Sequence, residues 1–332
     1  MFGLSAFQLP RSTDSVTVGF PIEDKFVVAV ASSALFDLAE SDAVFRTQGP
    51  SAYRIHQRQH EHLPFGAGVA FPLIRRLLHL NDDFPETRPV EVVLLSRNDP
   101  DTGLRAFNTI EHLDLDISRA AFVSGRDPFR YMETFNASLF LSANPDDVQA
   151  ALNAGLPAGR VYSTSQPADD GERELRIAFD FDGVLADDSA ERVFQEQALA
   201  GFHESERTLG DEPMLAGPLR RFLEGISKLQ QMELEKQATD DSYVPRIRTA
   251  IVTARNAPAH RRVITTLRHW GIQVDEAFFL GGIDKSKVLK QFKPHIFFDD
   301  QMRHVEDAST VSPVVHIPFG VANKIPKRPE TE

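Results

Sequence analysis

The stretch that decides the fold is Leu175–Val184, which reads LRIAFDFDGV. Its first five residues predict a buried strand, and Asp180 and Asp182 follow that strand directly. Side chains two positions apart on an extended segment point the same way, and Gly183 then allows a sharp turn. Taken alone, an Asp-x-Asp pair is more typical of a polar turn. Two carboxylates this close repel each other unless a cation lies between them, so the pair also indicates a divalent metal.

Further polar residues stand at the ends of other predicted elements. Thr253 ends a strand, Lys285 begins a helix after two glycines, and Asp299 and Asp300 follow the strand Ile296–Phe298. Each has a simpler interpretation, as a helix cap, a solvated lysine or an acidic turn. Their joint order is more specific, because a hydroxyl, a lysine and a second carboxylate pair at strand ends can together hold a phosphate group.

Short apolar runs alternate with amphipathic stretches along the chain, which predicts an α/β fold with a parallel sheet. The expected strands are Lys25–Ala31, Val90–Leu95, Ala120–Val123, Leu139–Leu141, Leu175–Phe179, Arg248–Val252, Ala277–Leu280, Ile296–Phe298 and Val314–Ile317. Helical spacing marks Pro72–Leu80, Pro218–Leu229, Arg262–Trp270 and Val288–Phe292. The 332 residues suffice for two domains, predicted at 20–162 and 173–320, with a linker at 163–172 and tails at 1–19 and 321–332.

The two predicted domains resemble each other. A shift of 149 aligns Val28–Phe45 with Ile177–Phe194, and a shift of 157 aligns Thr109–Ala151 with Thr266–Ala308, with nine identical pairs. We interpret this as a duplicated core; the alternative is two unrelated α/β domains that share a periodicity. The first copy is then degenerate, because it lacks every charged residue of the set. Asp180, Asp182, Thr253, Lys285, Asp299 and Asp300 align with Ala31, Ser33, Ser96, Pro128, Ser142 and Ala143.

Composition excludes several classes of function. Lys and Arg total 36 against 48 for Asp and Glu, a formal net charge of −12, which argues against binding to nucleic-acid polymers or membrane surfaces. The absence of cysteine excludes disulfides, thiolate metal sites and thiol nucleophiles. The first residues lack the features of a signal peptide, and no apolar run reaches the length of a membrane span. We therefore expect a cytoplasmic protein.

The order Asp-x-Asp, Thr, Lys, Asp-Asp resembles the haloacid dehalogenase superfamily of phosphatases. The stretches LRAFNTIEHLDL, AGPLRRFLEGISKLQ, IRTAIVTARNAPAHRR and KPHIFFDDQMRHVEDA are similar to the cytosolic 5′-nucleotidase type I family, and the resemblance runs from about Phe26 to Lys324. It implies a Rossmann-like core with a short cap insertion and Mg²⁺-dependent hydrolysis of nucleoside 5′-monophosphates. Motif I reads Asp-Phe-Asp-Gly-Val here, unlike the Asp-Gly-Asp-Ala-Val of animal members, so their nucleotide preference does not transfer.

The resemblance also implies a role for each residue. Asp180 is the nucleophile that forms an aspartyl-phosphate, and Asp182 is the general acid and base. The phosphate-binding residues are Thr253 and Lys285, and Arg255, just beyond Thr253, is a further candidate for phosphate or ribose contact. The Mg²⁺ ligands are Asp180, Asp182, Asp299 and Asp300, and the sequence leaves open whether Asp300 binds the metal directly.

Contacts to the nucleoside are less determined. The segment between Asp182 and Gly217 is short for a cap, so the first half or a second subunit could cover the substrate. Candidates for nucleoside contact are Asn98, Arg105, Phe107 and Asn108; loop caps and a packed phenylalanine explain them equally well. The spacing of His56, His60 and His62 could chelate a metal, but Arg58 and Glu61 among them favour a solvated polar face.

Two other functions remain open. One is hydrolysis of a different small phosphomonoester, such as a sugar phosphate, and the other is nucleotide binding without turnover, as a regulator. The intact acidic set in the second half argues against the regulator. The sequence leaves a homo-oligomer open as well.

Overall fold

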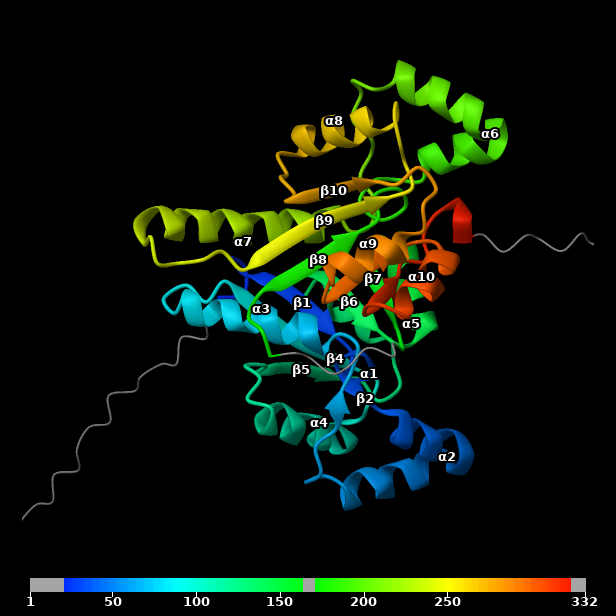
Figure 1. Ribbon diagram of the computed structural model, residues 1–332. Coiled ribbons are helices and arrows are strands. Elements are labelled where there is room, and N and C mark those ends of the chain that lie inside the picture. The colour runs from blue at the N-terminus through cyan, green and yellow to red at the C-terminus, as the bar shows by residue number, and fades with distance from the viewer. Residues whose placement is uncertain (1–20, 164–170, 324–332) are drawn as a thin grey trace, which may run out of the picture.

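In a computed structural model, which describes residues 21–163 and 171–323, the chain forms one large sheet covered by helices (Figure 1). The strands of the large sheet are β1 (Phe26–Val30), β4 (Val90–Ser96), β5 (Arg119–Phe122), β6 (Ala137–Ser142), β7 (Ala158–Tyr162), β8 (Leu175–Phe179), β9 (Ile247–Thr253), β10 (Glu276–Phe279), β11 (Ile296–Asp299) and β12 (Val314–His316). A separate small sheet pairs β2 (Phe36–Asp37) with β3 (Gly66–Ala67).

The helices connect these strands. They are α1 (Ser32–Leu35), α2 (Ala39–Gln59), α3 (Phe71–Asp83), α4 (Pro100–His112), α5 (Pro145–Asn153), α6 (Ser189–Thr208), α7 (Arg220–Thr239), α8 (His260–Trp270), α9 (Lys285–Phe292) and α10 (Met302–Ser309), with 3-10 turns η1 (Pro128–Tyr131) and η2 (Val321–Asn323). None of the helices in the described ranges is long and apolar enough to cross a membrane.

The order of strands across the large sheet is β10-β9-β8-β11-β12-β7-β6-β1-β4-β5. Each half of the chain therefore contributes five neighbouring strands. Counted from the outermost strand to the centre, the order is β5-β4-β1-β6-β7 in the first half and β10-β9-β8-β11-β12 in the second, which is the same order along the chain. All neighbouring pairs are parallel except β12 and β7, which are antiparallel and join Val314 to Tyr162. Because direction reverses at this seam, the carboxyl ends of the strands in the two halves lie at opposite edges of the sheet.

The core alternates along each strand, as expected for a sheet with both faces buried. Val28 and Val30 pack with α3, α4 and α7 on one face, whereas Val27 and Ala29 pack with α5 on the other. In the second half Ala178 packs with α9 and α10. The α/β fold with a mostly parallel sheet is thus confirmed, while the two domain boundaries stay a prediction, since one sheet runs through both halves.

All nine predicted strands form, but the sequence reading missed β7. Its residues, AGRVY, include a glycine and an arginine and so lack the apolar run that marks the other strands. The glycine has a reason: a Cβ on Gly159 would lie 2.9 Å from Ile317 Cδ1 and closer still to Val315 Cγ1. Only a residue without a side chain lets the two halves meet at the seam.

Two long helices fold back on themselves. The backbone of α2 is non-helical at Gly49 (φ 81°), and that of α6 is non-helical at Ala198 (φ 56°), so each forms a helical hairpin. Figure 1 shows α2 and α6 far apart, at the bottom and top of the view. The hairpin of α6 occupies the short insertion between Asp182 and Gly217.

Parts of the predicted linker and tails have a definite place. Residues 1–19, most of the linker and residues 324–332 lie outside the described ranges. Val321–Asn323, within the predicted C-terminal tail, instead form η2 and contact the second half: the backbone N–H of Val321 donates to Asp188 Oδ2 at 2.8 Å.

Candidate functional site

The predicted catalytic residues meet at one edge of the sheet. Asp180 directly follows β8, Thr253 is the last residue of β9, and Asp299 is the last residue of β11. Because β8 lies between β9 and β11, these three strand ends are neighbours. The carboxyl ends of parallel strands are where α/β sheets bind ligands.

A buried lysine links two of the carboxylates. Lys285 begins α9, and its Nζ lies 2.7 Å from Asp180 Oδ2 and 2.7 Å from Asp299 Oδ2. All three side chains are almost completely buried. Burial raises the pKa of Asp180 to about 6, against the attraction of Lys285. Burial also acts to raise the pKa of Asp299, but Lys285 and His304 outweigh it and hold that pKa below its usual value.

Asp300 lies beside this pair, and no described residue forms an ion pair with it. Burial, together with the charges of Asp180 and Asp299, raises the pKa of Asp300 to about 9. Its Oδ1 is buried and has no hydrogen-bond partner among the described residues. The absence of a side chain at Gly183 leaves room for Asp300, because a Cβ at Gly183 would lie 2.6 Å from Asp300 Cγ. The φ of Gly183 is 71°. The close approach and the left-handed backbone both require glycine.

The donor set fits a hard divalent cation. Asp180, Asp299 and Asp300 bring three carboxyl groups together against one lysine, and one buried oxygen is unpaired. Ligand atoms of Asp180, Asp299 and His304 lie within 4.8 Å of one another. Oxygen donors around a shared centre suit Mg²⁺, whose charge offsets the repulsion between buried carboxylates.

Asp182 is held by an arginine. Arg255 Nε and one terminal nitrogen donate to the two carboxylate oxygens of Asp182, both at 2.7 Å, in a bidentate pair. The other terminal nitrogen pairs with Glu206 of α6 and donates to the Ala259 carbonyl at 3.3 Å. The charge of this buried guanidinium is therefore matched by two carboxylates, and the structure does not present it as an open phosphate contact. Thr253 Oγ1 accepts from the Arg255 backbone N–H at 3.2 Å.

The residues expected to contact the nucleoside do not reach this edge. Asn98 follows β4, whose carboxyl end lies at the opposite edge of the sheet. Arg105 donates to the Leu63 carbonyl at 2.9 Å and to Gln57 at 3.1 Å. Phe107 packs against Phe122, and Asn108 donates to the Glu61 carbonyl. Packing and loop bonding account for Arg105, Phe107 and Asn108. The reversal of strand direction at the seam places the strand ends of the first half far from Asp180.

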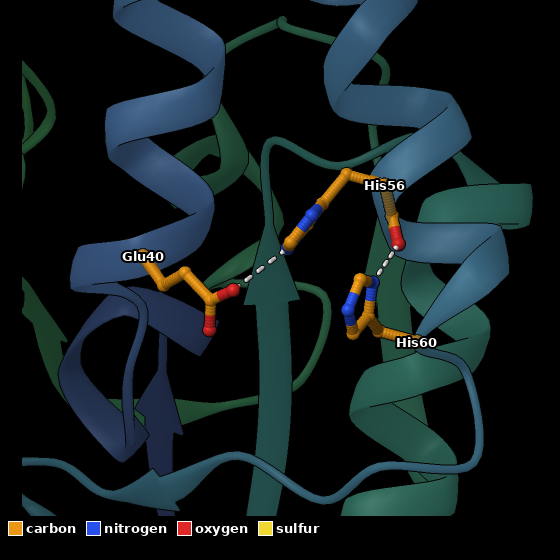
Figure 2. Close-up of side chains that lie close together, drawn as sticks. All are labelled: Glu40, His56 and His60. Atoms are coloured by element: carbon orange, nitrogen blue, oxygen red, sulfur yellow. Dashed lines mark hydrogen bonds and ion pairs between the residues drawn. The ribbon is translucent and has the colours of Figure 1, made fainter.

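The sequence favoured one solvated face for His56, His60 and His62, and the structure differs from that expectation. The rings of His56 and His60 lie 4.2 Å apart, and His56 Nε2 is 3.9 Å from Glu40 Oε1, as Figure 2 shows. The His56 side chain is only 12% exposed, whereas that of His62 is 86% exposed and pairs with Glu61. Burial lowers the pKa of His56, and the charges of His60 and Arg105 add to this effect against the opposing charge of Glu40.

Three site residues were missed by the sequence reading. Glu206 is fully buried between Arg255 and Arg262, with no local signal to mark it. Asn323 Nδ2 donates to the Asp300 carbonyl at 2.8 Å from a segment taken as a tail. His304 Nδ1 lies 3.4 Å from Asp299 Oδ1. Its place one helical turn after an acidic pair could have been noticed.

Comparison with known proteins decides the family. A sequence model described as 5′-nucleotidase matches residues 18–324. The chain belongs to the 5′-nucleotidase family. It is also similar to cytosolic 5′-nucleotidase 1B of Homo sapiens, with 31% identity over 303 residues, which cover 90% of this chain and 49% of the relative. The chain thus spans about half the length of that relative. These matches confirm the resemblance noted from the sequence.

Proposed function

We propose that this member of the 5′-nucleotidase family is a Mg²⁺-dependent enzyme that hydrolyses nucleoside 5′-monophosphates to nucleoside and phosphate. The observation that carries the proposal is the buried set of Asp180, Asp299 and Asp300 around Lys285, at the sheet edge where α/β enzymes bind ligands. The name of the family, and that of the human relative, supply the substrate class. We place the reaction in the cytoplasm, since the human relative is named a cytosolic 5′-nucleotidase.

The metal would be held by the carboxylates of Asp180, Asp299 and Asp300 together with the backbone carbonyl of Asp182, whose side chain is paired with Arg255. When bound, Mg²⁺ neutralises phosphate charge and so lets an anionic nucleophile approach. In this proposal Lys285 and the Thr253 hydroxyl hold phosphoryl oxygens, Lys285 with a compact charge and Thr253 with a hydrogen bond. This local charge also offsets the net charge of −12, which would otherwise repel an anionic substrate.

In the first step a carboxylate oxygen of Asp180 bonds to phosphorus while the bond from phosphorus to the 5′-oxygen breaks. Asp182 donates a proton to that oxygen, and the nucleoside leaves. A water molecule then gives its proton to Asp182 and attacks phosphorus, which releases phosphate and restores the Asp180 carboxylate. The bidentate contact with Arg255 fixes where the Asp182 carboxyl group points, so we assign Arg255 a positioning role.

We further propose that the first half is a degenerate copy of the catalytic half. The shared strand order supports this, and so do the starts of β4 and β9, which differ by the sequence offset of 157. Gly49 and Ala198, where the two hairpins turn, differ by the other offset, 149. The hairpin of α6 then serves as the cap of the catalytic pocket, and that of α2 is its counterpart.

Phosphate release from a panel of nucleoside monophosphates and sugar phosphates, with Mg²⁺ and with a chelator, tests the proposal. We expect release from nucleotides only, lost with the chelator and abolished by Asp180→Asn. Preferential release from sugar phosphates would favour the broader phosphomonoesterase. Nucleotide binding without release would favour the regulator. Residual turnover by Asp180→Asn would overturn its role as the nucleophile, since the first half offers no carboxylate at Ala31.

A further inference from the structure

The first half contains a cavity of about 890 Å³ at the carboxyl ends of β1, β4 and β6. Its lining includes Ser33, Ser96, Asn98 and Ser142, together with Phe45 and Tyr53 of α2. These strand ends lie at the edge of the sheet opposite Asp180. The cavity is therefore separate from the catalytic site.

Local bonding in this cavity matches that of the catalytic site. The Asn98 backbone N–H donates to Ser96 Oγ at 3.2 Å, and in the second half the Arg255 N–H donates to Thr253 Oγ1 at 3.2 Å. The Asn144 N–H likewise donates to the Ser142 hydroxyl at 3.1 Å, where Gln301 donates to the Asp299 carboxylate at 2.9 Å. The residue two positions after each of these strand ends thus makes the same type of hydrogen bond in both halves.

The hairpins are docked in the same way. Arg105 donates to Gln57 and to the Leu63 carbonyl, and Arg262 donates to Glu206 and to the Glu212 carbonyl. All three pairs of residues differ by the sequence offsets of 149 or 157. Each hairpin is therefore fixed by an arginine from the helix after the second strand of its half, so equivalent elements stand beside the strand ends in both halves.

An aromatic pair stands on each hairpin. The rings of Phe45 and Tyr53 meet edge to face, 5.6 Å apart at 87°, and those of Phe194 and Phe202 meet 6.2 Å apart at 88°. Phe45 is 50% exposed and Phe194 is 45% exposed, although both are large apolar side chains. An exposed aromatic ring beside a polar pocket suits the flat face of a base.

The strand ends of the two halves differ in charge. The first half has Ala31, Ser33, Ser142 and Ala143 where the second has four aspartates, and Pro128 in place of Lys285. Its lining arginines are already paired: Arg54 with Asp99 at 2.6 Å, and Arg97 with Asp147 at 2.5 Å. The lining also contains the carboxylates of Asp42 and Asp146, and among the described residues both of its cations are paired, so none is left for a phosphate.

We propose that this cavity binds a nucleoside, an uncharged molecule with a base and hydroxyl groups. The inference rests on the proposed function. Suppose that the catalytic site takes a nucleoside monophosphate. The features present in both halves, which are the hairpin and its aromatic pair, then serve the nucleoside. The features lost from the first half, which are the aspartates and the lysine, serve the phosphate. The ring of Phe45 contacts the base, and the Ser33 hydroxyl and the Asn98 amide nitrogen bond the sugar, above the buried Ser96 and Ser142. The nucleoside that the proposed reaction releases is therefore also the ligand of the cavity in the first half.

Calorimetric titration of the full chain with adenosine, guanosine, cytidine and uridine tests the proposal. We compare Phe45→Ala with the matched change Phe194→Ala; both residues are about half exposed, so the fold should survive, and thermal melting checks this. A stacked ring contributes enough that its loss weakens binding by about tenfold or more. We expect at least one nucleoside to bind at a site that Phe45→Ala weakens and Phe194→Ala does not. Failure of all four nucleosides to bind, or binding that responds only to Phe194→Ala, would overturn the proposal.

Two further arms separate this proposal from the catalytic one. Titration with inorganic phosphate and with the matching nucleoside monophosphate, using Asp180→Asn to prevent turnover, measures the effect of charge. Weaker binding of the monophosphate than of the nucleoside at the Phe45-dependent site supports the inference, and tighter binding would overturn it. Phosphate release is measured on the same wild-type preparation. Hydrolysis without Phe45-dependent binding would contradict only the nucleoside site in the first half. Phe45-dependent binding without hydrolysis would contradict only the proposed catalytic function.

Discussion

At the catalytic edge, the contact between Arg255 and Asp182 can be tested by a substitution that keeps the charge. A lysine cannot form the bidentate pair, so Arg255→Lys should leave Asp182 less well oriented. We expect kcat for phosphate release to fall by about 10- to 100-fold, up to the lower end of the roughly 100- to 10,000-fold that general acid–base catalysis contributes, with a smaller change in KM.

The matched control for that variant is Arg262→Lys. Arg262 also pairs with Glu206, but neither its side chain nor its backbone bonds to Asp182 among the contacts described. Equal losses in the two variants would show that the cap, rather than the orientation of Asp182, is affected.

Gly183 gives a second prediction at this scale. Gly183→Ala must accommodate a left-handed backbone and displace Asp300, whereas Gly271→Ala meets a similar φ of 68° with nothing within 4 Å. Both should lose about 1–2 kcal/mol of unfolding free energy from the backbone. Only Gly183→Ala should also raise the Mg²⁺ concentration needed for half-maximal phosphate release. An unchanged metal requirement would contradict the role given to Asp300.

Individual residues show where sequence reasoning succeeds. Asp180, Thr253, Lys285 and Asp299 follow or begin elements of strong apolar periodicity, so their meeting at one edge could be predicted. The partner of Arg255 could not, because Asp182 and Glu206 come from segments far away in sequence and their approach depends on how α6 turns. The position of Arg255 just after a strand predicted a contact with phosphate or ribose. In the fold, its charge is instead paired with the carboxylates of Asp182 and Glu206.

At the scale of elements, the hairpin of α6 turns at an unfavourable residue. Ala198 has φ 56° and ψ −170°, a region that costs a side-chain-bearing residue about 1–3 kcal/mol. Ala198→Gly should therefore increase the free energy of unfolding by about 1 kcal/mol after the entropic cost of glycine. Urea denaturation measures the change.

A neighbouring alanine provides the control for the hairpin. Ala200 lies in the helical part of α6 and is exposed, so Ala200→Gly should lower the free energy of unfolding by about 1 kcal/mol. Opposite signs at two positions in one helix distinguish a local backbone effect from a general effect of glycine. A loss of stability in Ala198→Gly would contradict the assigned strain.

Three of the elements that the sequence did not predict share a cause, although the uninterrupted helices α1, α4, α5 and α10 were not predicted either. The helices α2 and α6 are interrupted near their middles, so neither shows a long amphipathic period, and β7 replaces apolar residues with Gly159 and Arg160. In each case the residue that breaks the pattern is one that the tertiary arrangement requires. Elements buried on both sides of the sheet kept their signal.

For the whole molecule, α3 of the first half packs against the second half, and His79 lies on that helix. Arg76 of α3 donates to the Glu174 carbonyl at 2.9 Å, and Asp83 accepts from Arg246 at 2.8 Å. Burial lowers the pKa of His79 from 6.5, so the unfolded chain takes up a proton at that residue more readily than the folded chain. Its contribution to stability is present above pH 6.5 and is lost as the pH falls through that value.

The corresponding test uses His79→Gln. Urea midpoints measured at about pH 7.5 and about pH 5.5 should show a smaller decrease on acidification in the variant than in the wild type, because the variant lacks this titrating group. Buried carboxyl groups titrate equally in both proteins and cancel from the comparison. The same decrease in both would contradict the assignment.

The antiparallel seam between β12 and β7 has a consequence for the electric field of the protein. In a fully parallel α/β sheet, the helices between strands all point the same way and their dipoles add. Here the two halves point in opposite directions, so their dipoles largely cancel, and helix amino ends face both edges of the sheet. An approaching anion is therefore not oriented by one overall dipole, and each pocket must attract its ligand with its own nearby charges. The two pockets can thus differ completely in charge preference within one continuous sheet.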